Sequence, residues 1–264
     1  MIQIKTALKT MGLVFLTATF FTSCSDDAND STIDQELTQT EVQTIVEIDA
    51  ITTSVDNVLS ELYTFGNDAS KTTQKANECY AAEYTENGFT ATFNNCALNG
   101  TDNVNGTLNV TYTVNGNTAG FSATYTDFYV GEVKIDGTRA YVIEFDESTN
   151  EVALVITSDI SLEMADGSII AESGTKTLLF GFDETLEELT FAITGDWTVQ
   201  ADGNTYQVTT ISPLQIEGIC DYFTSGSMQI SKNGLEVIVD FGDGTCDALA
   251  TLTYPNGTTE DITL

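Results

Sequence analysis

Apolar and polar residues alternate along most of the chain from about residue 78 to the C-terminus. In the run 235–241 every second residue is apolar: Leu235, Val237, Val239 and Phe241. Alternation at period two places one set of side chains on one face of a β-strand. Many of the runs are bounded by Asn-Gly or Asp-Gly, dipeptides that accept positive φ at low cost and form tight hairpins. The pattern predicts a mainly β protein made of antiparallel sheets or a sandwich.

The alternating runs give the following strand predictions, which precede a meander over 220–264: 79–84, 89–93, 108–114, 121–125, 128–135, 139–145, 151–163, 176–182, 189–194, 197–200, 206–211 and 215–218. The predicted turns include Asn87-Gly88, Asp136-Gly137, Asp166-Gly167, Asp202-Gly203, Asn233-Gly234, Asp243-Gly244 and Asn256-Gly257.

A different period precedes the strands. Between about Asp34 and Tyr63, apolar residues recur every three to four positions, with no Gly or Pro among them. This spacing predicts one amphipathic helix, assigned to 41–66 with Gly66 as its C-terminal stop. Its many Thr and Val residues lower helix propensity, so we expect it to need a partner. That partner is the apolar face of the following sheet or, alternatively, a second copy in a coiled coil.

An internal sequence repeat suggests that the β region, 78–264, contains two related modules, at about 78–146 and 190–264. Each has a cysteine-opened strand, an Asn-Gly hairpin, an alternating strand and a closing cysteine. The four cysteines of this region allow three pairings, and the internal repeat favours Cys79–Cys96 and Cys220–Cys246. A metal or redox site is disfavoured because the chain has neither Cys-x-x-Cys nor histidine.

The N-terminus has the pattern of a secretory leader. Residues 1–23 combine two lysines with an apolar core too short for a stable membrane span, and they end at Cys24. Phe21-Thr22-Ser23-Cys24 is similar to the lipobox of bacterial lipoproteins, which implies lipidation of Cys24. Ser25-Asp26-Asp27 resembles the surface-export signal of lipoproteins from Bacteroidota. Residues 24–40 are then a flexible tether, and we expect a lipid-anchored protein at the outer membrane, facing the cell surface.

The charge balance restricts the partners. The chain has 8 basic and 40 acidic residues, a formal net charge of −32. A field of this sign repels nucleic acid, so we expect no nucleic-acid partner. The acidity fits a soluble surface and also fits cation binding. The absence of histidine removes the commonest general base and transition-metal ligand.

Two small sets of residues are candidates for binding. Asp240, Asp243 and Asp247 lie in one glycine-rich segment, and carboxylate oxygens suit calcium. Their spacing is not that of an EF-hand loop, which favours the alternative of a glycine-rich hairpin with solvated acids. We expect no other cofactor. Trp197, Tyr206 and Tyr222 are candidates for a sugar-stacking platform, although aromatic residues on strands are commonly core.

The chain also resembles a widespread set of uncharacterised lipoproteins of Bacteroidota. The resemblance rests on Asp240–Asp247 (DFGDGTCD), the closing Asp261–Leu264 (DITL), and the mid-chain segments Thr126–Val130 (TDFYV) and Ile135–Arg139 (IDGTR). It implies an all-β surface lipoprotein and supplies no activity, ligand or catalytic residue.

The sequence therefore predicts a cell-envelope lipoprotein that acts as a non-catalytic surface binding or adhesion module, with glycan or protein as ligand. The alternatives are a structural envelope protein that assembles through its helix, and a carboxylate-based glycoside hydrolase, which needs two acids facing a cleft. No catalytic residue is assigned.

Overall fold

The computed structural model describes residues 36–66, 74–76, 79–98, 101, 103–115, 118–146, 151–182, 189–216, 220 and 222–264. Within these ranges the chain forms one helix, α1 (Gln39–Gly66), followed by fourteen strands. The strands are β1 (Gln74–Ala76), β2 (Tyr80–Thr85), β3 (Gly88–Cys96), β4 (Val104–Asn115), β5 (Thr118–Val130), β6 (Val133–Asp146), β7 (Glu151–Glu163), β8 (Ile169–Phe182), β9 (Leu189–Ala201), β10 (Asn204–Ile216), β11 (Ser225–Lys232), β12 (Leu235–Asp243), β13 (Leu249–Thr253) and β14 (Thr259–Thr263).

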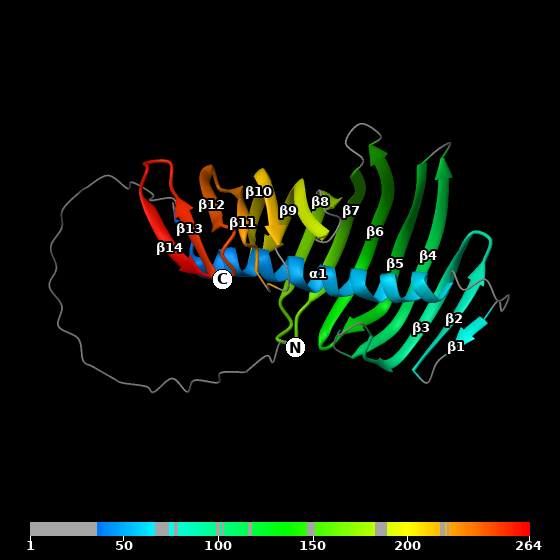
Figure 1. The fold of residues 1–264 in the computed structure, drawn as a ribbon. Coiled ribbons are helices and arrows are strands. Elements are labelled where there is room, and N and C mark those ends of the chain that lie inside the picture. Colours follow the sequence, from blue (N-terminus) through cyan, green and yellow to red (C-terminus); the bar gives the residue numbers. More distant parts are fainter. Residues whose placement is uncertain are drawn as a thin grey trace, which may run out of the picture. The chain divides into compact units, whose positions relative to one another are not determined.

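The strands form a single antiparallel meander, because each pairs with the strands that precede and follow it in the chain (Figure 1). The mainly β, antiparallel prediction with one N-terminal helix is confirmed. The strands lie in one extended sheet rather than in two packed sheets, and residues Glu36–Leu264 form one compact unit. β7 and β8 continue the sheet between the two predicted modules.

Several predicted strand ends are wrong, because local irregularities in long strands resemble turns in the sequence. The predicted strands 121–125 and 128–135 meet at Asp127, which has a φ of 45° and belongs to a bulge inside β5. The true break is the turn at Gly131-Glu132. Gly195 and the register shift between Thr209 and Leu214 similarly lie within β9 and β10, and the sequence pattern wrongly divides each of these into two strands.

The Asn-Gly and Asp-Gly dipeptides occur in two different structural contexts. Asp202-Gly203 and Asn233-Gly234 form the expected two-residue turns, with both φ values positive in each pair. Asp136-Gly137 instead lies inside β6, where a Cβ on Gly137 would approach the Asp159 carbonyl oxygen to 2.2 Å. Glycine is required there because the backbone of β7 is too close for a side chain.

The start of α1 has a capping box, Thr38-x-x-Glu41. The Thr38 backbone N–H donates to Glu41 Oε2 at 2.9 Å, and the Glu41 N–H donates to Thr38 Oγ1 at 3.3 Å. Leu37 and Val42, both buried, occupy the flanking positions of a hydrophobic staple. The helix therefore begins at Gln39, two residues before the predicted start.

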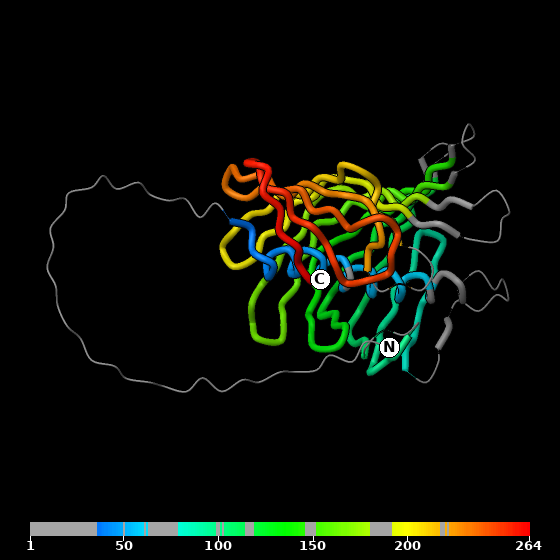
Figure 2. Tube along the Cα trace, turned by 60° about the vertical axis from the view of Figure 1, so that its left-hand side comes forward, coloured from blue at the N-terminus to red at the C-terminus, as the bar shows by residue number. Residues whose placement is uncertain are grey.

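The sheet is the partner of α1, as the first of the two alternatives predicted. The buried face of the helix contributes Val42, Ile45, Ile48, Thr52, Val55, Val58, Leu59 and Leu62, and Leu37 is buried just before the helix. Figure 2 shows α1 crossing the strands, and hydrogen bonds attach it near both edges of the sheet: Tyr84 donates to the Leu62 carbonyl and Tyr254 to that of Leu37. The core lies between α1 and this one face of the sheet.

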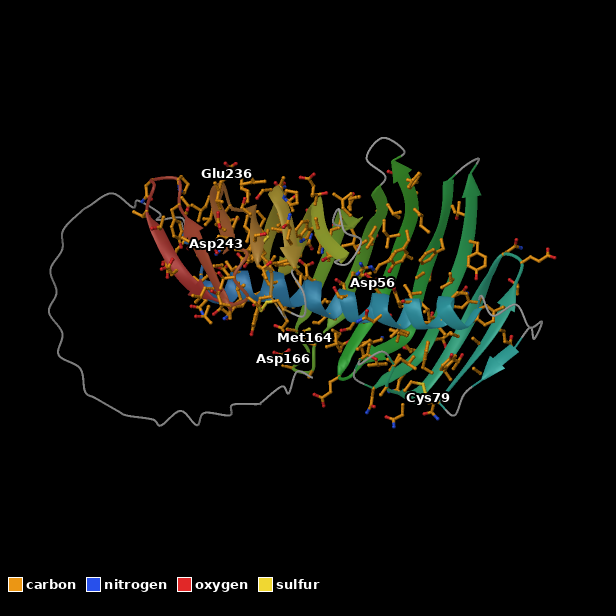
Figure 3. The ribbon with its side chains drawn as sticks, viewed as in Figure 1. Asp56, Cys79, Met164, Asp166, Glu236 and Asp243 are labelled. Carbon is orange, nitrogen blue, oxygen red and sulfur yellow. A yellow bond between two sulfur atoms is a disulfide. The ribbon has the colours of Figure 1, made fainter. Side chains whose placement is uncertain are left out.

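Both favoured disulfides are present. Cys79–Cys96 ties the start of β2 to the end of β3 and is marked by Cys79 in Figure 3. Cys220–Cys246 encloses β11 and β12 near the other end of the sheet.

Candidate functional site: a polar cluster beneath the helix

Three acidic residues of α1 meet three basic residues of the sheet. The acidic residues are Glu41, Asp49 and Asp56. They are eight and seven residues apart, so they recur after about two helical turns. Seven residues of helix rise about 10 Å, close to two strand spacings of about 4.8 Å. A helix that crosses the strands therefore advances about one strand per turn, and these carboxylates reach β11, β8 and β6 in order.

The ion pairs nearest the middle of the helix centre on Lys176 of β8. Its Nζ donates to Asp49 Oδ1 and, at 2.6 Å, to Glu172 Oε2 on the same strand. It also lies 4.6 Å from the centroid of the Trp197 ring on β9, a cation–π contact. Lys176 and Glu172 are buried at 9% and 1% exposure. Two carboxylates and one aromatic ring thus compensate a desolvated ammonium group.

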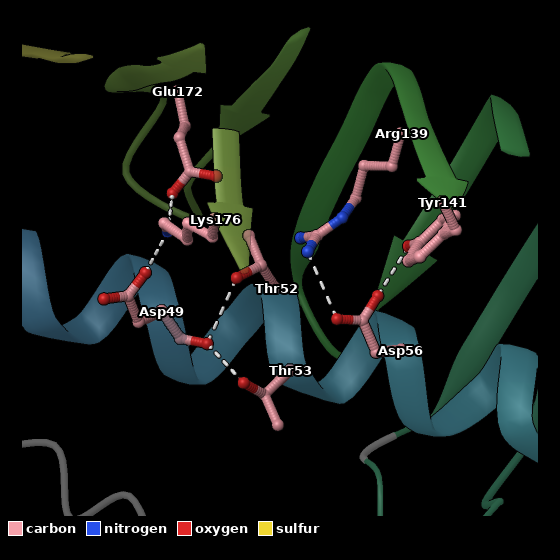
Figure 4. A network of polar contacts seen from close by, with 8 residues as sticks. All are labelled: Asp49, Thr52, Thr53, Asp56, Arg139, Tyr141, Glu172 and Lys176. Carbon is pink, nitrogen blue, oxygen red and sulfur yellow. Dashed lines mark hydrogen bonds and ion pairs between the residues drawn. The ribbon is translucent and has the colours of Figure 1, made fainter. Parts of the chain in front are cut away.

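One further ion pair lies two helical turns along α1 (Figure 4). Arg139 Nη2 donates to Asp56 Oδ2 at 3.1 Å, and the Tyr141 hydroxyl donates to Asp56 Oδ1 at 2.6 Å. The Tyr141 ring is stacked on Phe121 with centroids 4.4 Å apart. We call Asp49, Asp56, Arg139, Tyr141, Glu172 and Lys176 the α1 cluster.

The α1 cluster combines three carboxylates with two cations in a largely desolvated site, and this imbalance affects the proton affinity of the carboxylates. Burial raises the pKa of Asp49; Lys176 opposes the rise and Glu172 adds to it. Burial likewise raises the pKa of Asp56, against the effects of Arg139 and Tyr141. Because α1 covers these groups, and Asp49 and Asp56 each bond to a partner in the sheet, the cluster is arranged to hold α1 on the sheet. Glu172 Oε1 is buried in the cluster without a hydrogen-bond partner.

The pKa of Glu41 is shifted in the opposite direction. Burial alone would raise its pKa, but Lys232, the Thr38 backbone and side chain, and the Tyr206 hydroxyl lower it to about 2. Glu41 Oε1 accepts from Lys232 Nζ and from the Tyr206 hydroxyl, both at 2.7 Å. The ionised carboxylate is therefore the form that the folded state favours.

Glu41→Gln should remove a pH-dependent part of the stability. A carboxyl group with a lowered pKa stabilises the fold above its unfolded pKa, near 4.3, and loses this contribution as the pH falls toward about 2. We expect the variant to be less stable than wild type in urea at pH 7, with a smaller difference at pH 2.5. Glu36→Gln, at an exposed position just before α1, is the control. A difference that is equal at both pH values would contradict this account.

The predicted calcium ligands do not converge. Asp240, Asp243 and Asp247 are exposed, and each accepts a local hydrogen bond: from the Gly242 N–H, the Thr245 hydroxyl and the Leu249 N–H, respectively. Figure 3 marks Asp243 on β12, well away from Asp56 on α1. Within the described ranges, no three His, Cys, Asp or Glu residues are grouped so that they could hold a metal ion.

The predicted stacking residues are not together on a surface either. Trp197 and Tyr206 are each 3% exposed and lie in the core, whereas Tyr222 is 37% exposed. The burial of Trp197 and Tyr206 fits the core alternative considered above. Cys24, with the leader and residues 24–35 of the predicted tether, lies outside the described residues, so lipidation stays a prediction. Residues 36–40, predicted as the end of the tether, instead form the capped start of α1.

The face of the sheet opposite α1 is rich in hydroxyl groups, and we call it the open face. Arg139 points to α1, so its neighbour Thr138 points to the open face. Register partners of Thr138 form a polar row across eight strands: Thr90, Asn109, Thr124, Thr138, Asp159, Ser173, Thr198 and Gln207. The adjacent row contains Thr111, Ser122, Ala140, Thr157, Thr175, Asp196 and Thr209.

A shallow hollow of about 400 Å³ lies on this face beside Ser122 and Ala140 of the second row. Its lining consists of Thr113, Gly120, Phe121, Ser122, Ala140, Tyr141 and Val142. By register, the side chains of Thr113, Ser122, Ala140 and Val142 belong to the open face. The hollow exists because Gly120 and Ala140 leave little side chain between Thr113 and Val142. It combines two hydroxyl groups with a small apolar floor.

Comparisons with known proteins add no relative: no family model, curated protein or solved structure matches the chain. Among the helices of the described part of the chain, none is long and apolar enough to span a membrane.

Proposed function

We propose that this protein is a non-catalytic binding module of the cell envelope, anchored through a lipid on Cys24, whose open face binds an extended polyhydroxylated ligand such as a surface glycan. The hollow at Gly120 and Ala140 is the observation that carries the proposal. Sugars present hydroxyl groups beside apolar C–H patches, and the hollow offers Thr113 and Ser122 beside Ala140 and Val142.

Further polar groups lie around the hollow on the open face. The in-register rows place hydroxyl, amide and carboxylate groups about 4.8 Å apart across many strands, a repeat suited to a long ligand rather than to a small molecule. Some of these groups bond one another, as Thr209 does with Asp196 at 2.6 Å and Thr157 with Thr175 at 3.3 Å. The charged residues of the α1 cluster, by contrast, are used to hold α1. Binding is thus better supported than acid–base catalysis.

Ala140→Leu tests the proposal by filling the hollow. Ala140 is exposed, so the longer side chain should occupy the hollow without disturbing the core. We expect the purified wild-type protein to bind members of a glycan array, and Ala140→Leu to weaken that binding at least tenfold. Cells that express Cys24→Ala should lose surface binding of the same glycan.

Ala119→Leu is the matched control, since Ala119 is also exposed but pairs in register with Ile143 on the α1-bearing face of the sheet. It should bind like wild type. If no glycan binds the wild-type protein, or if both leucine variants lose binding equally, the hollow is not the binding site.

A further inference from the structure

The α1-bearing face of the sheet continues as apolar surface beyond the helix. Ile143 and Phe145 follow Tyr141 at the same parity on β6, so they point to the side on which α1 lies. They are 48% and 58% exposed. Across the strands, Ile143 is in register with Leu154, Leu178 and Ile193, and Phe145 with Val152. We call Ile143, Phe145, Val152, Leu154, Leu178 and Ile193 the apolar shelf.

The apolar shelf is continuous with an interface that the structure already shows. Tyr141, two residues before Ile143 on β6, is buried and donates a hydrogen bond to Asp56 of α1. Leu154 and Ile193 are half-buried and pack against the core beneath α1. Exposed apolar surface beside a buried interface marks an interaction site more often than isolated exposed residues do.

α1 indicates which shape fits this face. Its ion pairs show that a helix perpendicular to the strands advances about one strand per turn. The apolar shelf spans β6 to β9, three strand spacings or about 14 Å, which matches about ten helical residues. A short amphipathic helix with apolar residues at i, i+3, i+4 and i+7 would place about one apolar side chain on each strand.

Charge selects among the helices that could fit. Three of the eight basic residues of the chain, Arg139, Lys176 and Lys232, are buried beneath α1. Lys134 lies within 3.6 Å of both Asp127 and Asp136. Few basic residues remain outside these contacts, and the chain has 40 acidic residues, so its formal net charge of −32 places the apolar shelf in a negative field. A second copy of the chain or a fatty-acid anion has the same sign of charge as this surface, whereas a basic helix is complementary.

We propose that the apolar shelf docks a basic amphipathic helix of a partner protein, laid across β6–β9 beside α1. This interaction uses the face opposite the proposed glycan surface and does not depend on it.

The test uses the full-length protein and a labelled 15-residue Leu/Lys peptide with helical i, i+3, i+4, i+7 periodicity, monitored by fluorescence anisotropy. The expected result is binding at low ionic strength that weakens as salt is added. The double variant Ile143→Ser/Phe145→Ser should weaken binding at least tenfold. Leu249→Ser, at a position 54% exposed on β13, should leave binding unchanged.

Two further peptides complete the design. A Leu/Lys peptide of the same composition without the periodicity, and a Leu/Glu peptide with it, should both bind at least tenfold more weakly. Equal binding of the non-periodic peptide would show general charge attraction and overturn the proposal. Self-association of the wild-type protein that the double variant abolishes would assign the apolar shelf to a second copy, which also overturns it.

Discussion

Lys176→Met should lower the free energy of unfolding by about 3–5 kcal/mol, the range for breaking a buried ion pair from one side. Lys176 Nζ is the partner of both Asp49 Oδ1 and Glu172 Oε2, and all three side chains are at most 16% exposed. Without the ammonium group, two carboxylates remain close together in a desolvated site. The effect is measured by urea denaturation followed by circular dichroism near pH 8.

The pH dependence of this loss identifies its origin. A buried carboxyl group without its cation takes up a proton more readily, and burial together with Glu172 already favours the protonated form of Asp49. Protonation removes the unpaired charge, so the destabilisation should be smaller at pH 5.5 than at pH 8. A loss that does not depend on pH would indicate missing packing of the lysine chain instead.

Lys134→Met is the matched control. Lys134 also lies between two carboxylates, at 3.6 Å from Asp127 and 3.3 Å from Asp136, but those side chains are 81% and 53% exposed. Exposed ion pairs contribute about 0–1 kcal/mol. If the two lysine variants were equally destabilised, burial of the α1 cluster would not be the cause.

The helix and the fold class could be predicted because their signals are local. Apolar spacing from Val42 to Leu62 identified α1, and alternation identified the strands. The capping box Thr38-x-x-Glu41 is also present in the sequence and places the helix start. Bulges could not be separated from turns, because Asp127 and Asp202 have similar positive φ values of 45° and 51° in different contexts. Only the pairing of the neighbouring strand distinguishes them.

The α1 cluster was missed for a different reason. Each of its pairs joins residues 80 or more positions apart, except Glu172 with Lys176, and depends on the order of the strands. A partial signal existed: Lys176 occupies an inward position, in the same alternation as Leu178. A lysine at an apolar position of a strand indicates a buried partner. Which of the 40 acids provides it is fixed by tertiary structure alone.

Gly174→Ala should destabilise the protein by about 4 kcal/mol. Gly174 of β8 has a φ of +143°, and an added Cβ would lie 2.5 Å from both the Asp196 carbonyl oxygen and the Trp197 Cα. An unfavourable φ costs about 1–3 kcal/mol, and overpacking costs about 1–3 kcal/mol more. Since Gly174 lies between Glu172 and Lys176, displacement of Trp197 should also loosen the cation–π contact, which fluorescence of this single tryptophan would report.

Gly203→Ala separates the two contributions. Gly203 has a φ of +77° in the turn between β9 and β10, and nothing lies within 4 Å of its added Cβ. Only the backbone cost remains there, so we expect a loss of about 1 kcal/mol and unchanged tryptophan fluorescence. Similar losses in the two alanine variants would mean that backbone conformation alone requires glycine at position 174. A much larger loss in Gly174→Ala would show that the close approach of β9 beneath α1 requires it.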